Sequence, residues 1–158
     1  MSVSAAPAAA SCGGVEHFWP RKVERKGAPP LALGDSIMLG AAEPLQRAGF
    51  EVDVRGCRQM SEGLQVLASR VRSHSLPSVV VVGLGTNWTV TTGQVRAAMR
   101  ILGENRVKVV DWAARSAGRS DWVWSDGLHL QPAGARALAR LMSVAFTWPL
   151  PGVEATFS

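Results

Sequence analysis

The stretch LPSVVVVGLGTN occupies residues 76–87 and carries the strongest structural signal in the chain. Its four successive valines, 79–82, are typical of a central parallel strand whose two faces are both buried. Glycines and a turn follow, and residues 92–102 then place apolar side chains at helical spacing before Gly103. This part of the chain therefore predicts a buried strand that leads through a glycine-rich loop into a helix.

The same strand-to-helix pattern recurs on both sides of this stretch. Strands are expected at 31–34, 50–54 and 107–110, and further helices at 37–48, 61–73 and 132–146. Such alternation indicates an α/β fold in which helices cover both faces of a parallel sheet of about four strands. In these folds, functional sites form in the crevice beyond the C-terminal ends of the strands.

The chain has 158 residues, a length that fits one domain. Residues 1–14 are small and of low complexity, and residues 15–30 are charged and contain prolines. We therefore expect a flexible N-terminal arm over 1–30, one folded domain over 31–146 and a loose C-terminal tail over 147–158.

Composition and charge exclude several classes of protein. Hydrophobic residues make up 47% and charged residues 18%, as in globular domains rather than disordered chains. The formal net charge is +5, but neither an RNA-binding aromatic motif nor zinc-finger spacing accompanies it, so we expect no nucleic-acid partner. No apolar run approaches the ~20 residues of a membrane span. The oligomeric state stays open.

Two cysteines, Cys12 and Cys57, lack the C-x-x-C spacing of a zinc site. Two interpretations remain open for them. They are either unrelated thiols or the two halves of a disulfide that pins the N-terminal segment to the domain. The second would imply an oxidising compartment.

Loops after the expected strands carry residues suited to one kind of chemistry. Ser36 lies at a strand-to-helix turn, near helix N–H groups that favour developing negative charge. A serine nucleophile needs a base, and the base needs a partner that fixes its tautomer, which His129 and Asp126 provide three residues apart. The Asn87 side chain and backbone N–H groups of Ser36 and the Gly56 loop are suited to stabilising an oxyanion.

Each of these residues has an ordinary alternative when it is taken alone. Ser36 would be a helix N-cap, Asp126 and His129 surface polar residues, and Asn87 a turn residue. Their order along one chain, each at the end of a strand or in the last loop, favours nucleophilic catalysis.

Four blocks resemble the SGNH (GDSL-like) hydrolase superfamily: Gly34-Asp35-Ser36, Gly56, Gly85-Thr86-Asn87 and Asp126-Gly127-Leu128-His129. The resemblance covers roughly residues 31–142. It is strongest to the bacterial branch found as stand-alone envelope proteins or attached to membrane acyltransferases that acetylate cell-surface glycans. It implies a three-layer α/β/α flavodoxin-like fold, with Ser36 as nucleophile, His129 as base and Asp126 as its orienting partner. The main-chain N–H groups of Ser36 and Gly56 and the Asn87 side chain would form the oxyanion hole.

Two features depart from this family. The glycine of the second block often directly precedes Arg-Gln in this branch, whereas Cys57 holds that place here and Gly56 lies one residue earlier. The family usually has another βα unit after the helix that follows Gly-x-Asn, whereas residues 103–106 pass directly to the last strand. We therefore expect a sheet shortened by about one βα unit, which could displace His129 relative to Ser36.

The resemblance implies a serine esterase that acts on small acyl esters, chiefly acetyl esters, through an acyl-enzyme intermediate, or a related O-acetyltransferase. Neither a metal nor another cofactor is expected. The substrate would be a small acyl ester or an acetylated glycan. An exported protein of the cell envelope or the extracellular space is expected, although no intact signal peptide is visible.

Three tryptophans, Trp88, Trp122 and Trp124, flank the expected site and either line an acyl or sugar pocket or pack over the loop. Two other functions compete with the enzyme. One is a non-catalytic SGNH-like domain that binds glycan or a protein partner. The other is a flavodoxin-like module that binds a phosphate ligand, for which the chain lacks a glycine-rich loop with a lysine.

Overall fold

The computed structural model describes residues 12–21, 28–103 and 112–147. The strands are β1 (Glu16–Phe18), β2 (Leu31–Gly34), β3 (Glu51–Val54) and β4 (Val80–Gly83). The helices are α1 (Ser36–Leu39), α2 (Ala42–Arg47), α3 (Met60–Arg72), α4 (Thr92–Leu102), α5 (Trp112–Ser116), the 3₁₀ turn η2 (Ser120–Trp122) and α6 (Pro132–Thr147). The strand expected at 107–110 lies outside the described residues.

The described strands form one sheet in the order β1-β3-β2-β4. Strand β2 runs parallel to both of its neighbours, so that Gly34 pairs with Val54 on one side and with Gly83 on the other. The loops after β2, β3 and β4 therefore leave the sheet at one edge. This register gathers the Ser36, Gly56 and Asn87 loops at that edge.

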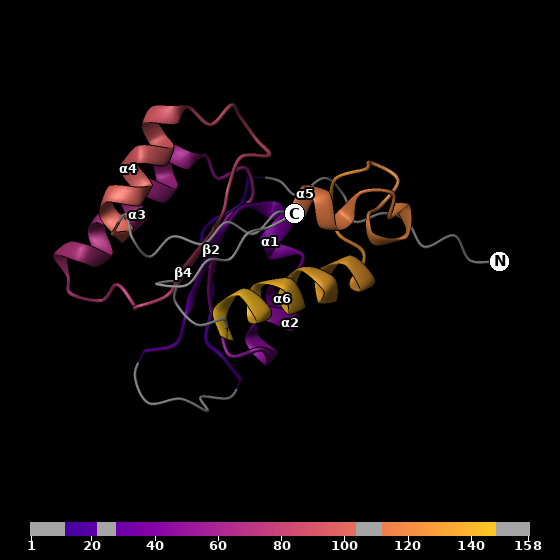
Figure 1. Cartoon of the computed structure of the whole chain (residues 1–158), viewed down its shortest axis with the longest axis horizontal. Helices are drawn as coiled ribbons and strands as arrows, with labels where there is room; N and C mark the ends of the chain where they lie inside the picture. Colours follow the sequence, from indigo (N-terminus) through magenta and orange to yellow (C-terminus); the bar gives the residue numbers. More distant parts are fainter. Residues whose placement is uncertain (1–11, 22–27, 104–111, 148–158) are drawn as a thin grey trace, which may run out of the picture.

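Helices cover both faces of the sheet, as the α/β prediction requires (Figure 1). On one face, α1, α2 and α6 pack against sheet residues that include Ala32, Val52 and Val54. On the other face, α3 and α4 pack against Leu31 and Leu33. The fold is thus a three-layer α/β/α sandwich. Among the described helices, none has the length and apolar character needed to cross a membrane.

The segment before Leu31 differs from the flexible arm that the sequence predicts. Residues 16–18 form β1, which pairs antiparallel with β3 and makes the sheet mixed. A disulfide also joins Cys12 to Cys57, which favours the second of the two interpretations of the cysteines. The short run 16–18 lacked a strand-like pattern of its own, and it is ordered by a neighbour distant in sequence.

The single helix expected over 37–48 is wrong, because the structure has two short helices there. Helix α1 ends at Leu39 with Gly40 as its C-cap, and α2 begins at Ala42. Pro44 explains the break. A continuous helix would need a Pro44 N–H to reach the Gly40 carbonyl, and the proline ring would clash with that carbonyl.

Strand β4 lies at an edge of the described sheet, and its residues are half-buried rather than fully buried as the sequence had predicted.

Strand β3 also differs from its prediction, since all four of its residues are buried, including Glu51 and Asp53. Burial acts to raise the pKa of Glu51, but bonds from Arg70 and His17 outweigh it and the pKa is lowered. The alternating pattern over 50–54 predicted that Glu51 and Asp53 lie on a polar face of the strand. In the structure, this face carries a buried network of ion pairs.

Candidate active site

Ser36 lies where the central strand β2 gives way to α1. Asp35 caps this helix, because its Oδ1 accepts the Ile37 N–H at 3.0 Å. Ser36 is only 8% exposed and opens the helix. The capping role thus falls to Asp35 and leaves the Ser36 hydroxyl available for another partner.

That partner is His129, whose Nε2 lies 3.2 Å from Ser36 Oγ. His129 lies in the loop between η2 and α6. A bridge between Val123 and Leu130 closes this loop, and the Trp124 N–H donates to the His129 carbonyl at 2.8 Å. A short hairpin-like turn therefore holds the His129 ring next to Ser36, which lies 93 residues earlier in the sequence.

Asp126 holds the other side of the ring. Its Oδ2 lies 2.7 Å from His129 Nδ1, and its Oδ1 accepts the N–H groups of Leu128 and His129 at 2.9 and 3.0 Å. The His129 side chain, and then these two backbone donors, lower the pKa of Asp126 to about 2. An ionised carboxylate only accepts hydrogen bonds, so Nδ1 carries the proton and Nε2 of a neutral ring accepts from the Ser36 hydroxyl.

Asn87 reaches the same edge of the sheet from the loop after β4. Its Nδ2 donates to Asp35 Oδ2 at 3.3 Å and to the Arg58 carbonyl at 3.4 Å. Thr86 Oγ1 donates to the same Asp35 oxygen at 2.5 Å. The fully buried Asp35 therefore ties the start of α1 to the β4 loop, and Asn87 is engaged with two protein acceptors through long bonds.

Gly56 lies in the loop after β3, where the Arg58 N–H closes a turn on the Arg55 carbonyl at 3.2 Å. Cys57 has a φ of 58°, in the left-handed region that favours glycine, at the place where the family carries its glycine. Within the described part of the chain, neither the Gly56 nor the Cys57 N–H donates to an acceptor. Gly56 is buried and Cys57 half-buried, and both N–H groups lack a described protein acceptor.

Arg58 is a residue whose role the sequence did not reveal. The side chain is 2% exposed, and its Nη1 donates to the carbonyls of Asp53 at 2.7 Å and Gly34 at 3.3 Å. Its Nη2 pairs with Asp53 Oδ1 at 2.7 Å. Together with its carbonyl bond to Asn87, this arginine connects all three strand ends. A buried arginine within a loop next to a buried strand aspartate gives no local sequence signal.

The structure separates the three tryptophans. Trp88 is 72% exposed and flanks a small hollow with Gln59 and Gln94. Trp122 is buried and lines a different pocket, between α6 and the α5–η2 segment. Trp124 is half-buried and contributes its backbone N–H to the His129 loop.

A hydroxyl, an imidazole and a carboxylate in hydrogen-bonded series are suited to nucleophilic attack on an ester carbonyl. Across residues 12–21, 28–103 and 112–147, no three His, Cys, Asp or Glu side chains gather as metal ligands would. The α/β sandwich with this series at the C-terminal edge of its strands is the arrangement of an SGNH-type domain.

The chain is similar in sequence to peptidoglycan O-acetyltransferases. Peptidoglycan O-acetyltransferase OatA of Listeria monocytogenes is 26% identical over 143 residues, which cover 72% of this chain. O-acetyltransferase OatA of Staphylococcus aureus is 25% identical over 153 residues, which cover 77% of it. The chain spans 23% and 25% of the length of these two relatives. No family model matches the chain.

A solved structure has the same fold. It is the C-terminal catalytic domain of peptidoglycan O-acetyltransferase A from Streptococcus pneumoniae, with a methylsulfonyl adduct. The TM-score is 0.56 at 16% sequence identity, and the match covers 74% of this chain and 91% of that domain. The expected relation to SGNH-type hydrolases and the shortened flavodoxin-like fold are therefore confirmed.

Proposed function

We propose that this chain is a serine-dependent domain that acts on acyl esters, chiefly acetyl esters of a cell-wall glycan. The observation that carries the proposal is the series from Asp126 through His129 to Ser36, with separations of 2.7 and 3.2 Å. Ser36 is the proposed nucleophile, His129 the general base and Asp126 the residue that orients it.

The proposed reaction has two halves. Ser36 Oγ attacks the ester carbonyl while its proton moves to His129 Nε2. The tetrahedral intermediate collapses, the alcohol leaves with that proton, and an acyl-serine remains. Water, or a sugar hydroxyl, then attacks the acyl-serine and gives its proton to His129. The imidazolium returns that proton to Ser36 Oγ as the bond to the acyl group breaks, and the free acid, or the new sugar ester, is released. Asp126 stays ionised and stabilises the imidazolium in both halves.

The proposed oxyanion hole consists of the N–H groups of Ser36 and Gly56 and the Asn87 amide. The Gly56 N–H lacks a described protein acceptor, which supports this assignment, and the adjacent Cys57 N–H is a competing donor. Asn87 would have to exchange one of its two long bonds for the oxyanion, which is a small cost because bonds of 3.3 and 3.4 Å are weak.

Three observations support a cell-wall ester and an exported location. The Listeria relative is named for O-acetyl transfer on peptidoglycan, and the Staphylococcus relative for O-acetyl transfer. The Cys12–Cys57 disulfide suits an oxidising compartment. Trp88 offers an exposed aromatic face beside the site, on which a sugar ring can stack.

Hydrolysis of p-nitrophenyl acetate tests the proposal. We expect Ser36→Ala and His129→Ala each to lower kcat by about 10³-fold or more, and Asp126→Asn to lower it by up to ~10⁴-fold through the wrong tautomer. Labelling of Ser36 by a fluorophosphonate should disappear in Ser36→Ala.

Matched controls come from residues outside the site. Ser61→Ala removes an exposed serine of α3, and His74→Asn keeps a residue that tolerates the φ of 53° at that position. Both should retain wild-type kcat. Wild-type activity no greater than that of Ser36→Ala would contradict the enzyme and favour the non-catalytic, glycan- or protein-binding domain.

A further inference from the structure

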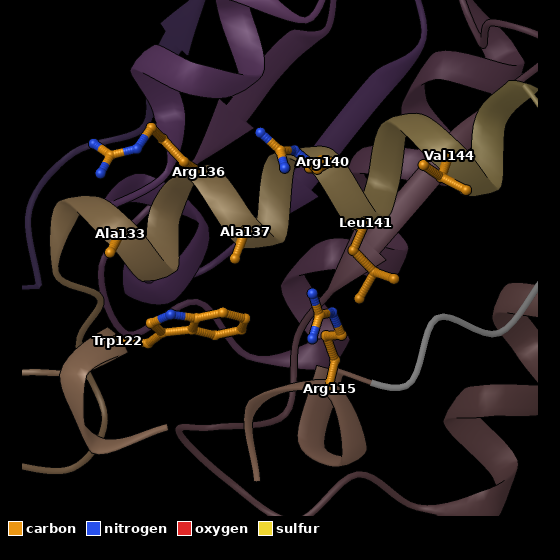
Figure 2. A pocket seen from close by; sticks show the side chains of 8 residues that line it. All are labelled: Arg115, Trp122, Ala133, Arg136, Ala137, Arg140, Leu141 and Val144. Carbon is orange, nitrogen blue, oxygen red and sulfur yellow. The ribbon is translucent and has the colours of Figure 1, made fainter. Parts of the chain in front are cut away.

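A second hollow lies between α6 and the α5–η2 segment, and Figure 2 shows the side chains around it. Its volume is about 360 Å³, within the range of small-ligand pockets. The lining residues are Arg115, Trp122, Ala133, Arg136, Ala137, Arg140, Leu141 and Val144. An apolar floor is thus combined with three arginines.

The floor of this pocket is formed by stacked aromatic rings. Trp122 stacks on Trp112 with a ring-centroid distance of 5.7 Å and an angle of 13°. The guanidinium groups of Arg115 and Arg119 lie 5.2 and 4.0 Å from the Trp122 ring centroid. Cation–π contacts of this kind hold a guanidinium in place while leaving its N–H groups free to donate.

The arginines of the pocket form no ion pair with the acidic residues that the structure describes in this region. The acidic residues between 112 and 147 are Asp121, which pairs with Arg119, and Asp126, which pairs with His129. Within the described residues, no ion pair involves the three lining arginines, Arg115, Arg136 and Arg140. Figure 2 shows Arg115 facing Trp122, whereas the exposed Arg136 and Arg140 extend from the other side of α6. An apolar floor with guanidinium groups at its outer edges is complementary to an anion with an apolar body.

The pocket is joined directly to the loop that carries His129. The Gln131 N–H donates to the Trp122 carbonyl at 2.9 Å, and Ala133 lies four residues after His129. A polymer with one group at Ser36 and an anionic branch nearby could therefore be held at both places by a single structural unit.

We propose that this pocket binds a carboxylate of the peptide branches that peptidoglycan carries beside its glycan. This inference rests on the proposed function, because the glycan ester would react at Ser36. Arginine binds carboxylates in bidentate geometry, and the alanyl and lactyl methyl groups of the same branch match the apolar floor. The pocket is thus a substrate-positioning site outside the catalytic series.

The test measures binding of N-acetylmuramyl-L-alanyl-D-glutamate to the full chain carrying Ser36→Ala, by calorimetry at low salt. Adding Arg136→Gln and Arg140→Gln together should weaken binding by about tenfold or more, as expected for lost charge-assisted bonds. The matched control is Arg96→Gln with Arg100→Gln, which removes the same charge at the same spacing from exposed positions of α4. The control should stay within about twofold, since distant exposed charges are screened.

Two further ligands separate the possible sources of the anion. Tri-N-acetylchitotriose carries no carboxylate and should show no difference between the two double variants. Glycerol phosphate should bind more weakly than the muropeptide. Equal weakening of muropeptide binding by both double variants would overturn the proposal, and so would tighter binding of glycerol phosphate in the pocket. Because the Ser36→Ala chain cannot turn over, this result is independent of the esterase test, and either proposal can fail alone.

Discussion

Arg58 shows how one buried side chain controls the geometry of the candidate site. It ties the end of β2 at Gly34 to the end of β3 at Asp53, and its carbonyl holds Asn87. Removing it would leave the buried Asp53 with Arg70 as its remaining cationic partner, at 3.6 Å. We therefore expect Arg58→Gln to lower the free energy of unfolding by roughly 3–5 kcal/mol, measured by urea denaturation.

Arg58→Lys separates the stabilising role of this residue from its positioning role. Lysine keeps the charge beside Asp53 but lacks the fork that also reaches Gly34. We expect it to recover part of the lost stability while kcat for p-nitrophenyl acetate stays at least tenfold below wild type with KM little changed. Full recovery of kcat in the lysine variant would show that Arg58 is purely structural.

At the scale of elements, the contact between α6 and η2 fixes the loop that carries His129. Gly134 lies in the first turn of α6, and a Cβ at this position would overlap the carbonyl oxygen of Trp122. Gly134→Ala would gain about 1 kcal/mol of helix propensity, but the overlap with rigid backbone must move η2 or α6. We expect a lower melting temperature and a kcat reduced by about tenfold or more, because the ring of His129 shifts.

Gly93→Ala is the matched control for this prediction. Gly93 lies in the first turn of α4, and a Cβ there would meet only Thr91 Oγ1, at an ordinary 3.8 Å. This variant should be as stable as wild type or slightly more stable, with unchanged kcat. A Gly134→Ala chain that behaves like Gly93→Ala would show that the α6–η2 contact does not position His129.

Local sequence patterns predicted some elements well and others poorly, for physical reasons. Helix α4 was predicted with its observed bounds because a regular apolar face and Gly103 mark it in the sequence. The helix over 37–48 was overextended because its apolar spacing hid the effect of Pro44. Strand β1 and the buried Glu51 depend on partners distant in sequence, which no local pattern contains.

The candidate site could be predicted further than its supporting contacts. Ser36, Asp126 and His129 are brought together as the motif order suggested. The Asp35 bonds to Thr86 and Asn87 and the role of Arg58 were missed, since each links strand ends that only the folded sheet makes neighbours. Trp88 and Trp122 were grouped because each lies near a motif residue in the sequence, yet the two line different hollows.

At the scale of the whole molecule, the described fold is consistent with a shortened flavodoxin-like domain. The alignment with Listeria OatA extends over 143 residues but takes in only 72% of this 158-residue chain. The alignment therefore contains positions that the relative fills and this chain does not. Such gaps agree with a shortened fold. Ser36 Oγ and His129 Nε2 nonetheless lie 3.2 Å apart in the described fold.

The disulfide gives this shortened fold an additional constraint. It links Cys12 to Cys57 across 45 residues, and Arg55 Nε also donates to the Gly13 carbonyl at 3.1 Å. We expect Cys12→Ser with Cys57→Ser to lower the free energy of unfolding by about 2–4 kcal/mol, measured by urea denaturation. Since the Gly56 N–H precedes the tether directly, kcat for p-nitrophenyl acetate should fall as well.

Reduction of the wild-type chain tests the same constraint without mutation. Dithiothreitol should lower its stability and kcat to the values of the double serine variant, leave that variant unchanged, and act reversibly on reoxidation. A Cys12→Ser chain with Cys57→Gly separates the tether from the backbone, because glycine adopts the φ of 58° with about 1 kcal/mol less strain. Recovery of kcat in this variant would mean that the left-handed turn, rather than the covalent link, positions the Gly56 N–H; a kcat that stays low would assign that role to the disulfide.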